Sequence, residues 1–114
     1  MSLERRGSQR IPSYLPVRLF SPEGQSLIET LTKDLSIGGI RCLTQKNPDN
    51  GSYEIELILA EGTEPIQAKG RIAWSRLIPQ GEQFEVGITF TDISIACRER
   101  LQRYIQRLTS HMSS

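Results

Sequence analysis

The stretch YEIELIL, residues 53–59, alternates apolar and charged side chains over its first five positions. Tyr53, Ile55 and Leu57 fall on one side of an extended chain and two glutamates on the other, which is the pattern of a strand with one buried face. The chain has 114 residues, a formal net charge of +1 and 37% hydrophobic residues, which is the size and composition of one folded domain. The stretch therefore indicates an all-β domain.

The same alternation recurs over residues 66–75 and 84–91, and short turns rich in Gly and Pro separate the three strands. Such turns favour antiparallel hairpins. Less regular strands are predicted at about residues 15–20, 25–33 and 40–44. Six strands in an open sheet would expose two edges, so we expect a closed, six-stranded antiparallel β-barrel.

The pattern changes after Asp92, where apolar residues recur at helical spacing. We expect a C-terminal helix over about residues 93–109, capped by Asp92 or Ser94 and packed on the barrel. The positions of its apolar face are Cys97, Leu101, Tyr104, Ile105 and Leu108.

The first 14 residues show no apolar alternation, and their glycine, serine and proline discourage a stable helix. We expect residues 1–14 to be a flexible arm, residues 15–109 to be the single domain, and residues 110–114 to be a tail. By itself, a charged arm of this kind is a solvated segment. The arm carries three arginines: Arg5, Arg6 and Arg10.

A second polar stretch, KDLSIGG at residues 33–39, lies ahead of a predicted strand. Asp34 and Ser36 fall on the same side of an extended chain, and Gly38 and Gly39 permit positive φ and a close approach of another group. Read alone, this composition also fits an Asx- or Ser-capped turn.

Together, the arm and residues 33–39 have the chemistry of a guanine site. The O6 and N7 acceptors of guanine fit the fork of a guanidinium group, and its N1–H and N2–H donors fit a carboxylate. Arginine also stacks on purines and pairs with phosphate. The two stretches therefore suit a ligand in which guanines and phosphates lie close together.

The motifs Arg6-x-x-x-Arg10 and Asp34-x-Ser36-x-x-Gly39, in this order and on a barrel of this length, resemble those of PilZ domains. The resemblance implies a split barrel with a C-terminal helix that binds the bacterial second messenger cyclic di-GMP. It implies that Arg6 and Arg10 contact guanine edges and phosphates. Asp34, Ser36 and Gly39 would hold the guanine that lies against the barrel.

Three further residues enter as ligand candidates: Arg5, Gly38 and Trp74. Arg5 precedes the first motif arginine and resembles the residue of members that bind a stacked pair of ligands. Trp74 falls on the inward side of its strand, which predicts a place in the core, although some PilZ proteins have an aromatic near this point against the ligand. Arg41 follows the two glycines and could flank the pocket, but we expect it, like the arginines of the predicted helix, to lie in solvent.

The resemblance implies a sensor in which the arm orders around cyclic di-GMP and the changed surface signals in trans to a protein partner in motility, pilus function or exopolysaccharide and biofilm formation. The alternative is a PilZ-type adaptor that works through protein contacts without a ligand. A barrel that binds single-stranded nucleic acid would need stacking aromatics on exposed strand positions and a basic groove. The aromatics of the predicted strands fall in the inward phase, so we expect no nucleic-acid partner.

Neither catalysis nor a metal site is indicated. The single histidine, His111, lies in the predicted tail, and no Ser-His-Asp or Cys-His set is present, so we predict no enzyme, no catalytic residues and no cofactor besides the ligand. Cys42 and Cys97 are far apart and predict reduced, structural thiols rather than a metal site. No apolar run approaches the roughly 20 residues that cross a bilayer, so we expect a cytoplasmic protein. We expect it to be a monomer or a weak homodimer.

Overall fold

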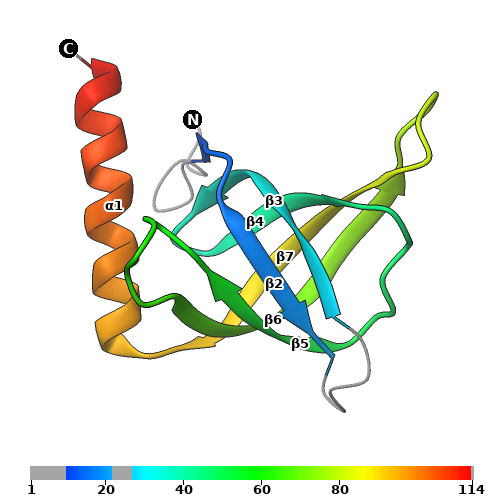
Figure 1. Cartoon of the computed structure of the whole chain (residues 1–114), viewed down its shortest axis with the longest axis horizontal. Coiled ribbons are helices and arrows are strands. Elements are labelled where there is room, and N and C mark those ends of the chain that lie inside the picture. Colours follow the sequence, from blue (N-terminus) through cyan, green and yellow to red (C-terminus); the bar gives the residue numbers. More distant parts are fainter. Residues whose placement is uncertain (1–9, 22–26, 114) are drawn as a thin grey trace, which may run out of the picture.

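The computed structural model describes residues 10–21 and 27–113, with the backbone alone for residues 111–113. Within these residues the chain forms seven strands and one helix. Figure 1 shows the strands wound around one another and the helix standing beside them. In chain order the elements are β1 (Ile11–Pro12), β2 (Pro16–Phe20), β3 (Leu27–Ser36), β4 (Gly39–Thr44), β5 (Ser52–Leu57), β6 (Ile66–Leu77), β7 (Phe84–Ile93) and α1 (Ile95–Ser113).

The strands close into a barrel. Their hydrogen-bonded order is β1-β3-β2-β5-β6-β7-β4, and β3 also pairs with β4, so β2 to β7 form a closed ring. Every pairing is antiparallel. The prediction of a six-stranded antiparallel barrel with a C-terminal helix is therefore confirmed, and closure gives each strand of the ring a partner on both sides.

Strand β1 extends the predicted domain. Ile11 pairs with Leu35 and Pro12 with Asp34, which places β1 along β3. The Ile11 side chain is buried, so it gives this segment an apolar anchor that the search for alternation overlooked. Proline, which has no N–H to donate, is tolerated in an edge strand. The end of the expected arm is thus paired with the barrel.

Alternating side chains of the strands fill the barrel interior. The predicted inward residues Tyr53, Ile55 and Leu57 are all buried, as are Val86 and Ile88 of β7. These side chains belong to a single core cluster. The alternation of the sequence therefore assigned the inward faces of β5 and of the central part of β7 correctly.

Trp74 is not in the core, and this part of the sequence prediction is wrong. Its side chain is 41% exposed. The register of β6 against β7 shifts between Ile72, which pairs with Ile88, and Trp74, which pairs with Gly87. Such a bulge adds one residue to a strand, so the alternation changes face beyond it. The bulge turns Trp74 to the outside of the barrel. An exposed aromatic on a strand is one of the features that binding of single-stranded nucleic acid needs, so that alternative is open again.

Helix α1 begins immediately after one of its predicted caps. The N–H of Cys97 donates to Ser94 Oγ at 3.1 Å, and the N–H of Arg98 donates to the carbonyl of Ser94 at 2.9 Å. Ser94 is therefore the N-cap. The helix continues to Ser113, beyond the predicted end at residue 109, so most of the expected tail is helical.

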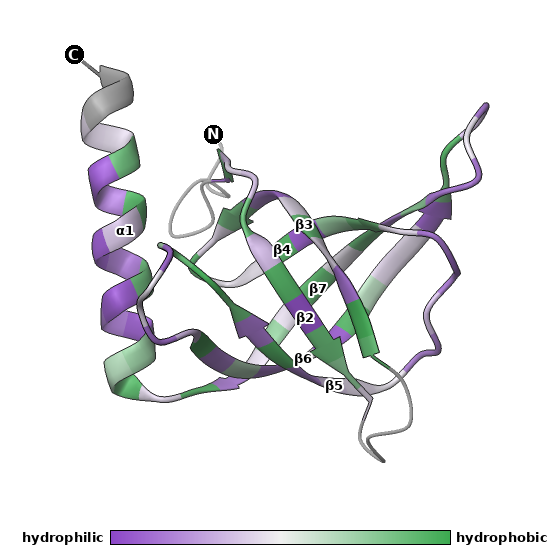
Figure 2. Ribbon diagram, viewed as in Figure 1, coloured by the Kyte–Doolittle hydropathy of each residue, from purple (hydrophilic) through white to green (hydrophobic). Residues whose placement is uncertain are grey.

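The helix packs its apolar face on the barrel. Leu101 is fully buried and belongs to the core cluster, with Cys97, Tyr104 and Ile105 packed partly against it. Figure 2 shows hydrophilic residues along the side of α1 that faces away from the strands. The hydroxyls of Tyr104 and Ser13 lie 3.4 Å apart, so the helix also meets the segment that follows β1.

The two cysteines are free, as predicted. Burial raises the pKa of the Cys42 thiol to about 12, so this side chain stays protonated at neutral pH. In the two described ranges, none of the helical structure has the length and hydropathy that crossing a membrane requires.

Candidate ligand-binding site

The β3–β4 hairpin carries the polar stretch at residues 33–39. Strand β3 ends at Ser36 and β4 begins at Gly39, so Ile37 and Gly38 form the turn. The N–H of Gly38 donates to Ser36 Oγ at 3.2 Å, and the same hydroxyl lies 3.5 Å from the carbonyl oxygen of Gly39. The hydroxyl of Ser36 is thus used within the hairpin, as in a serine-capped turn.

The two glycines of this hairpin have different surroundings. A Cβ on Gly39 would lie 2.1 Å from the carbonyl oxygen of Ile88, so β4 approaches β7 this closely only with glycine at this position. Gly38 is exposed, and a Cβ there would meet Ser36 Oγ at 4.0 Å. Neither glycine has a positive φ, so the conformational freedom expected of them is not used. Strand packing accounts for Gly39 without a ligand.

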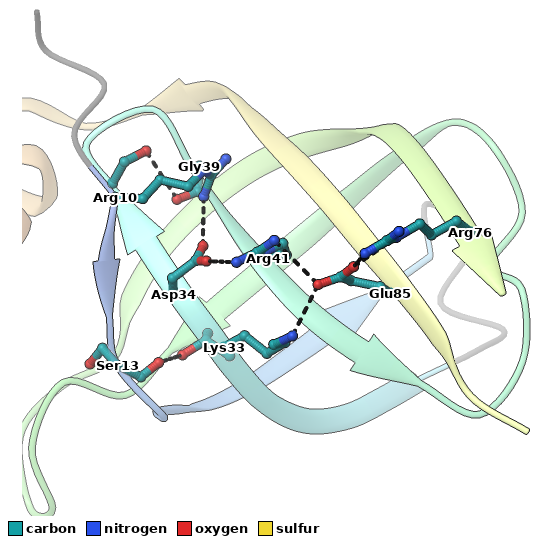
Figure 3. Close-up of polar contacts among 10 residues, drawn as sticks. Arg10, Ser13, Lys33, Asp34, Gly39, Arg41, Arg76 and Glu85 are labelled. Carbon is teal, nitrogen blue, oxygen red and sulfur yellow. Dashed lines mark hydrogen bonds and ion pairs between the residues drawn. The ribbon is translucent and has the colours of Figure 1, made fainter. Parts of the chain in front are cut away.

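Asp34 is the centre of the polar contacts on this face. Its side chain is 6% exposed, and its two oxygens contact different arginines. Arg10 Nη1 donates to Oδ1 at 2.8 Å, and Arg41 Nη2 donates to Oδ2 (Figure 3). Arg41 is therefore not a solvated side chain, as the sequence suggested, but a partner of the motif carboxylate.

Glu85 is a second buried carboxylate on the same face. Its side chain is 2% exposed and lies among three cations (Figure 3). Arg76 donates to Oε1 through Nε at 2.9 Å and Nη2 at 2.7 Å, while Lys33 Nζ lies 3.1 Å and Arg41 Nη1 3.3 Å from Oε2. The hydrogen bond from Arg76, followed by those cations, holds the pKa of Glu85 below its ordinary value despite burial.

The sheet brings these groups into one row. Asp34 of β3 pairs with Arg41 of β4, Arg41 pairs with Gly87 of β7, and Gly87 pairs with Trp74 of β6. Directly paired residues project from the same face of a sheet. A Cβ on Gly87 would lie 2.4 Å from Cε2 and Nε1 of the indole, so Trp74 lies across β7 on the face that Arg41 occupies.

The structure thus brings together four outward side chains: Arg10, Asp34, Arg41 and Trp74. Ser36 and Gly39 lie at the end of the same hairpin, with Ser36 buried. Arg5 and Arg6 lie outside the described residues. Sequence reasoning missed Glu85, which it read only as a polar position of an alternating strand. The sequence indicated that the Glu85 side chain faces outward. It did not indicate the strand register that places cations beside this side chain.

A cavity in the described part of the chain lies away from this row. It has a volume of about 620 Å³ and is lined by the start of β3, the end of β4, the β4–β5 loop and Tyr53. None of the predicted site residues that fall in the described ranges lines it. The row from Asp34 to Trp74 is therefore a separate surface on the outside of the barrel.

The sequence matches the model of the PilZ domain over residues 4–107. This chain belongs to the PilZ domain family. The matched range includes the two motifs, all of the strands and most of α1, so the resemblance noted from the motifs is confirmed. Among curated proteins, no match to this PilZ domain was found.

Solved structures resemble the fold of this PilZ domain. One is the Bacillus subtilis inhibitor of motility MotI/DgrA, with 22% identity, a TM-score of 0.76, and coverage of 95% of this chain and 53% of that chain. YcgR from Escherichia coli, in complex with c-di-GMP, has 18% identity, a TM-score of 0.75, and coverage of 96% and 48%. K. pneumonia MrkH in its apo state has 17% identity, a TM-score of 0.79, and coverage of 99% and 54%. The chain spans about half the length of each of these proteins, and at such identities the likeness establishes the fold.

Proposed function

We propose that this PilZ domain is a cyclic di-GMP receptor that signals in trans to a protein partner. The observation that carries the proposal is the ion pair between Arg10 and Asp34, at 2.8 Å. The two residues belong to different motifs and are separated by 24 positions in the sequence. The fold therefore joins the arginine motif to the carboxylate motif on one surface, as a guanine site requires.

Asp34 has acceptor positions left for a guanine beside its arginines. A carboxylate offers about four acceptor positions, and Arg10 and Arg41 occupy one on each oxygen. The remaining positions suit the N1–H and N2–H donors of a guanine. Arg10, whose side chain is 42% exposed, is then available to a phosphate or to the O6 and N7 edge of a base.

The other proposed contacts come from both sides of this centre. Trp74 presents an indole on which a base can stack, at the far end of the row that starts at Asp34. Ser36, Gly38 and Gly39 would border the guanine from the hairpin. The remaining proposed contacts are those of Arg5 and Arg6, and with Arg5 we expect a stacked pair of ligands.

Strand β1 connects the site to helix α1. Pro12 pairs with Asp34, and the next residue, Ser13, lies against Tyr104 of α1. A ligand that orders the arm would therefore change the position of β1 against the helix, and a protein partner could bind the changed surface. The structural similarity to MotI, an inhibitor of motility, supports an output in motility; pili and exopolysaccharide synthesis are the other outputs that we consider.

We further propose a cytoplasmic, non-enzymatic protein, without a cofactor, that is monomeric or weakly dimeric. The ligand-independent adaptor is the alternative, and the titration below separates it from the receptor.

The test is calorimetric titration with cyclic di-GMP, with GTP and a single-stranded oligonucleotide as competitors of other classes. We expect the wild type to bind cyclic di-GMP, and Asp34→Ala to raise the Kd at least about tenfold because guanine loses its carboxylate partner. Glu29→Ala, which removes an exposed carboxylate of the same strand, is the matched control and leaves the Kd unchanged.

The measured stoichiometry distinguishes one ligand from a stacked pair. Absence of binding at high micromolar cyclic di-GMP would favour the ligand-independent adaptor. Binding of the oligonucleotide in preference to cyclic di-GMP would instead favour a barrel that binds single-stranded nucleic acid, with the exposed Trp74 as a stacking residue.

A further inference from the structure

Arg41 connects the two buried carboxylates of the outer face. Its Nη2 donates to Asp34 Oδ2 and its Nη1 lies 3.3 Å from Glu85 Oε2. Its Nε is buried and has no hydrogen-bond partner among the described residues. The plane of the guanidinium group is therefore set from its two ends, by Asp34 on one side and Glu85 on the other.

The two arginines on Asp34 are held differently. Arg10 precedes β1, is 42% exposed, and has Asp34 as its ion-pair partner in the described part of the chain. Arg41 lies within β4, is 33% exposed and is tied to Glu85 as well. When Arg10 turns to a ligand, Arg41 remains on the carboxylate.

A carboxylate that reads guanine must keep a defined orientation. It accepts N1–H and N2–H together only when its plane is close to that of the base, as in other bidentate pairs. The terminal torsion of aspartate is broad, so the side chain by itself does not select that orientation. An arginine that is held in place on Oδ2 selects the orientation of the carboxylate.

We propose that Glu85, acting through Arg41, positions the Asp34 carboxylate for the N1–H and 2-amino edge of guanine and so sets the base specificity of the site. This inference rests on the proposed cyclic di-GMP function. Glu85 and Arg41 are positioning residues here, since neither needs to touch the base. The motifs of the sequence contain neither of them.

The experiment compares cyclic di-GMP with its inosine analogue, cyclic di-IMP, which lacks the 2-amino groups. The full chain is titrated with both ligands, and the ratio of the two Kd values reports the contact of the amino group with Asp34. For the wild type we expect a preference for cyclic di-GMP of about tenfold or more, the worth of a hydrogen bond to a charged group.

Arg41→Met should reduce this ratio to near one, because Asp34 then loses its fixed orientation. Arg76→Met is the control of equal charge: Arg76 contacts Glu85 through Oε1, the oxygen that Arg41 does not use. This variant should weaken both ligands equally, through the lost positive charge, and keep the wild-type ratio. A merely structural or long-range electrostatic role of Arg41 would likewise leave the ratio unchanged.

Glu85→Gln provides the second variant. This variant should lower the ratio although Arg41 is still present. The double variant of Glu85→Gln and Arg41→Met should have the same ratio as Arg41→Met alone, because the two residues act in series. Thermal unfolding of each variant confirms that the compared proteins are folded.

A wild-type ratio that survives in Arg41→Met overturns the inference and leaves the receptor function standing. A wild type that binds both ligands equally also overturns it, since Asp34 would not read the amino group. A wild type that binds neither ligand defeats the proposed function, and the inference with it.

Discussion

Two arginines on the outside of the barrel, Arg18 and Arg41, each lie between two carboxylates of neighbouring strands. Arg18 of β2 has Nε 3.1 Å from Glu29 on β3 and Nη1 3.7 Å from Glu56 on β5. These partners are 60% and 29% exposed, and Arg18 itself is 50% exposed. Water therefore screens this set, and such pairs contribute little to stability.

The arrangement around Arg41 has the same design with buried partners. Its carboxylates, Asp34 and Glu85, are 6% and 2% exposed. Burial makes each of these contacts matter more, because an unpaired charge that is removed from water is costly.

The comparison teaches that an arginine flanked by two acids is not informative by itself. Two features distinguish the regions: the carboxylates around Arg41 are buried, and a second set of cations is present there. Lys33 and Arg76 contact Glu85, whereas among the described residues Arg18 alone pairs with Glu29 and Glu56. A surplus of positive charge around buried carboxylates suits a surface that receives an anion.

The largest expected effect follows removal of Glu85. Glu85→Ala leaves three cations close together without their shared carboxylate, and we expect a loss of about 2 kcal/mol in the free energy of unfolding. The loss stays below the extreme for buried pairs because the cations reach water. Glu56→Ala, the matched change in the exposed set, should cost less than about 0.5 kcal/mol. Urea unfolding measures both, and equal losses would erase the distinction.

A smaller effect is expected from acid. The pKa of Glu85 in the folded protein lies below its ordinary value of 4.5. Its stabilising contribution is therefore complete above about pH 4.5 and is lost as the pH falls through the lower, folded-state pKa. The stability difference between the wild type and Glu85→Gln should shrink as the pH falls from 5 to about 3. A difference that stays constant over this range would contradict the assigned ion pairs.

The smallest effect is expected at Arg18. A double-mutant cycle between Arg18→Met and Glu29→Gln should give a coupling energy of about 0.3 kcal/mol at low salt. It should vanish near 1 M NaCl, where the screening length is about 3 Å. A coupling above about 1 kcal/mol that persists in salt would show that exposure does not separate the two regions.

Much of the fold was legible in local patterns. The alternation in β5 and β7 and the helical spacing before Leu108 predicted the elements, and the cost of open edges predicted closure. The two motifs indicated the family. What local patterns could not supply was the register: the bulge before Trp74 reversed its face, and the partners of Arg41 lie on strands that are distant in the sequence.

The sequence by itself determined most of the segments that are strands or helix, with β1 and the last turn of α1 as the exceptions, and it contained the residue types of a guanine site. Those properties depend on side-chain periodicity and chemistry, which are local. Only the tertiary structure decided that Asp34, Arg41, Gly87 and Trp74 form one row, and that Glu85 is buried among cations. Register and burial are set by how the whole ring of strands closes, because a shift of one residue turns every side chain to the opposite face.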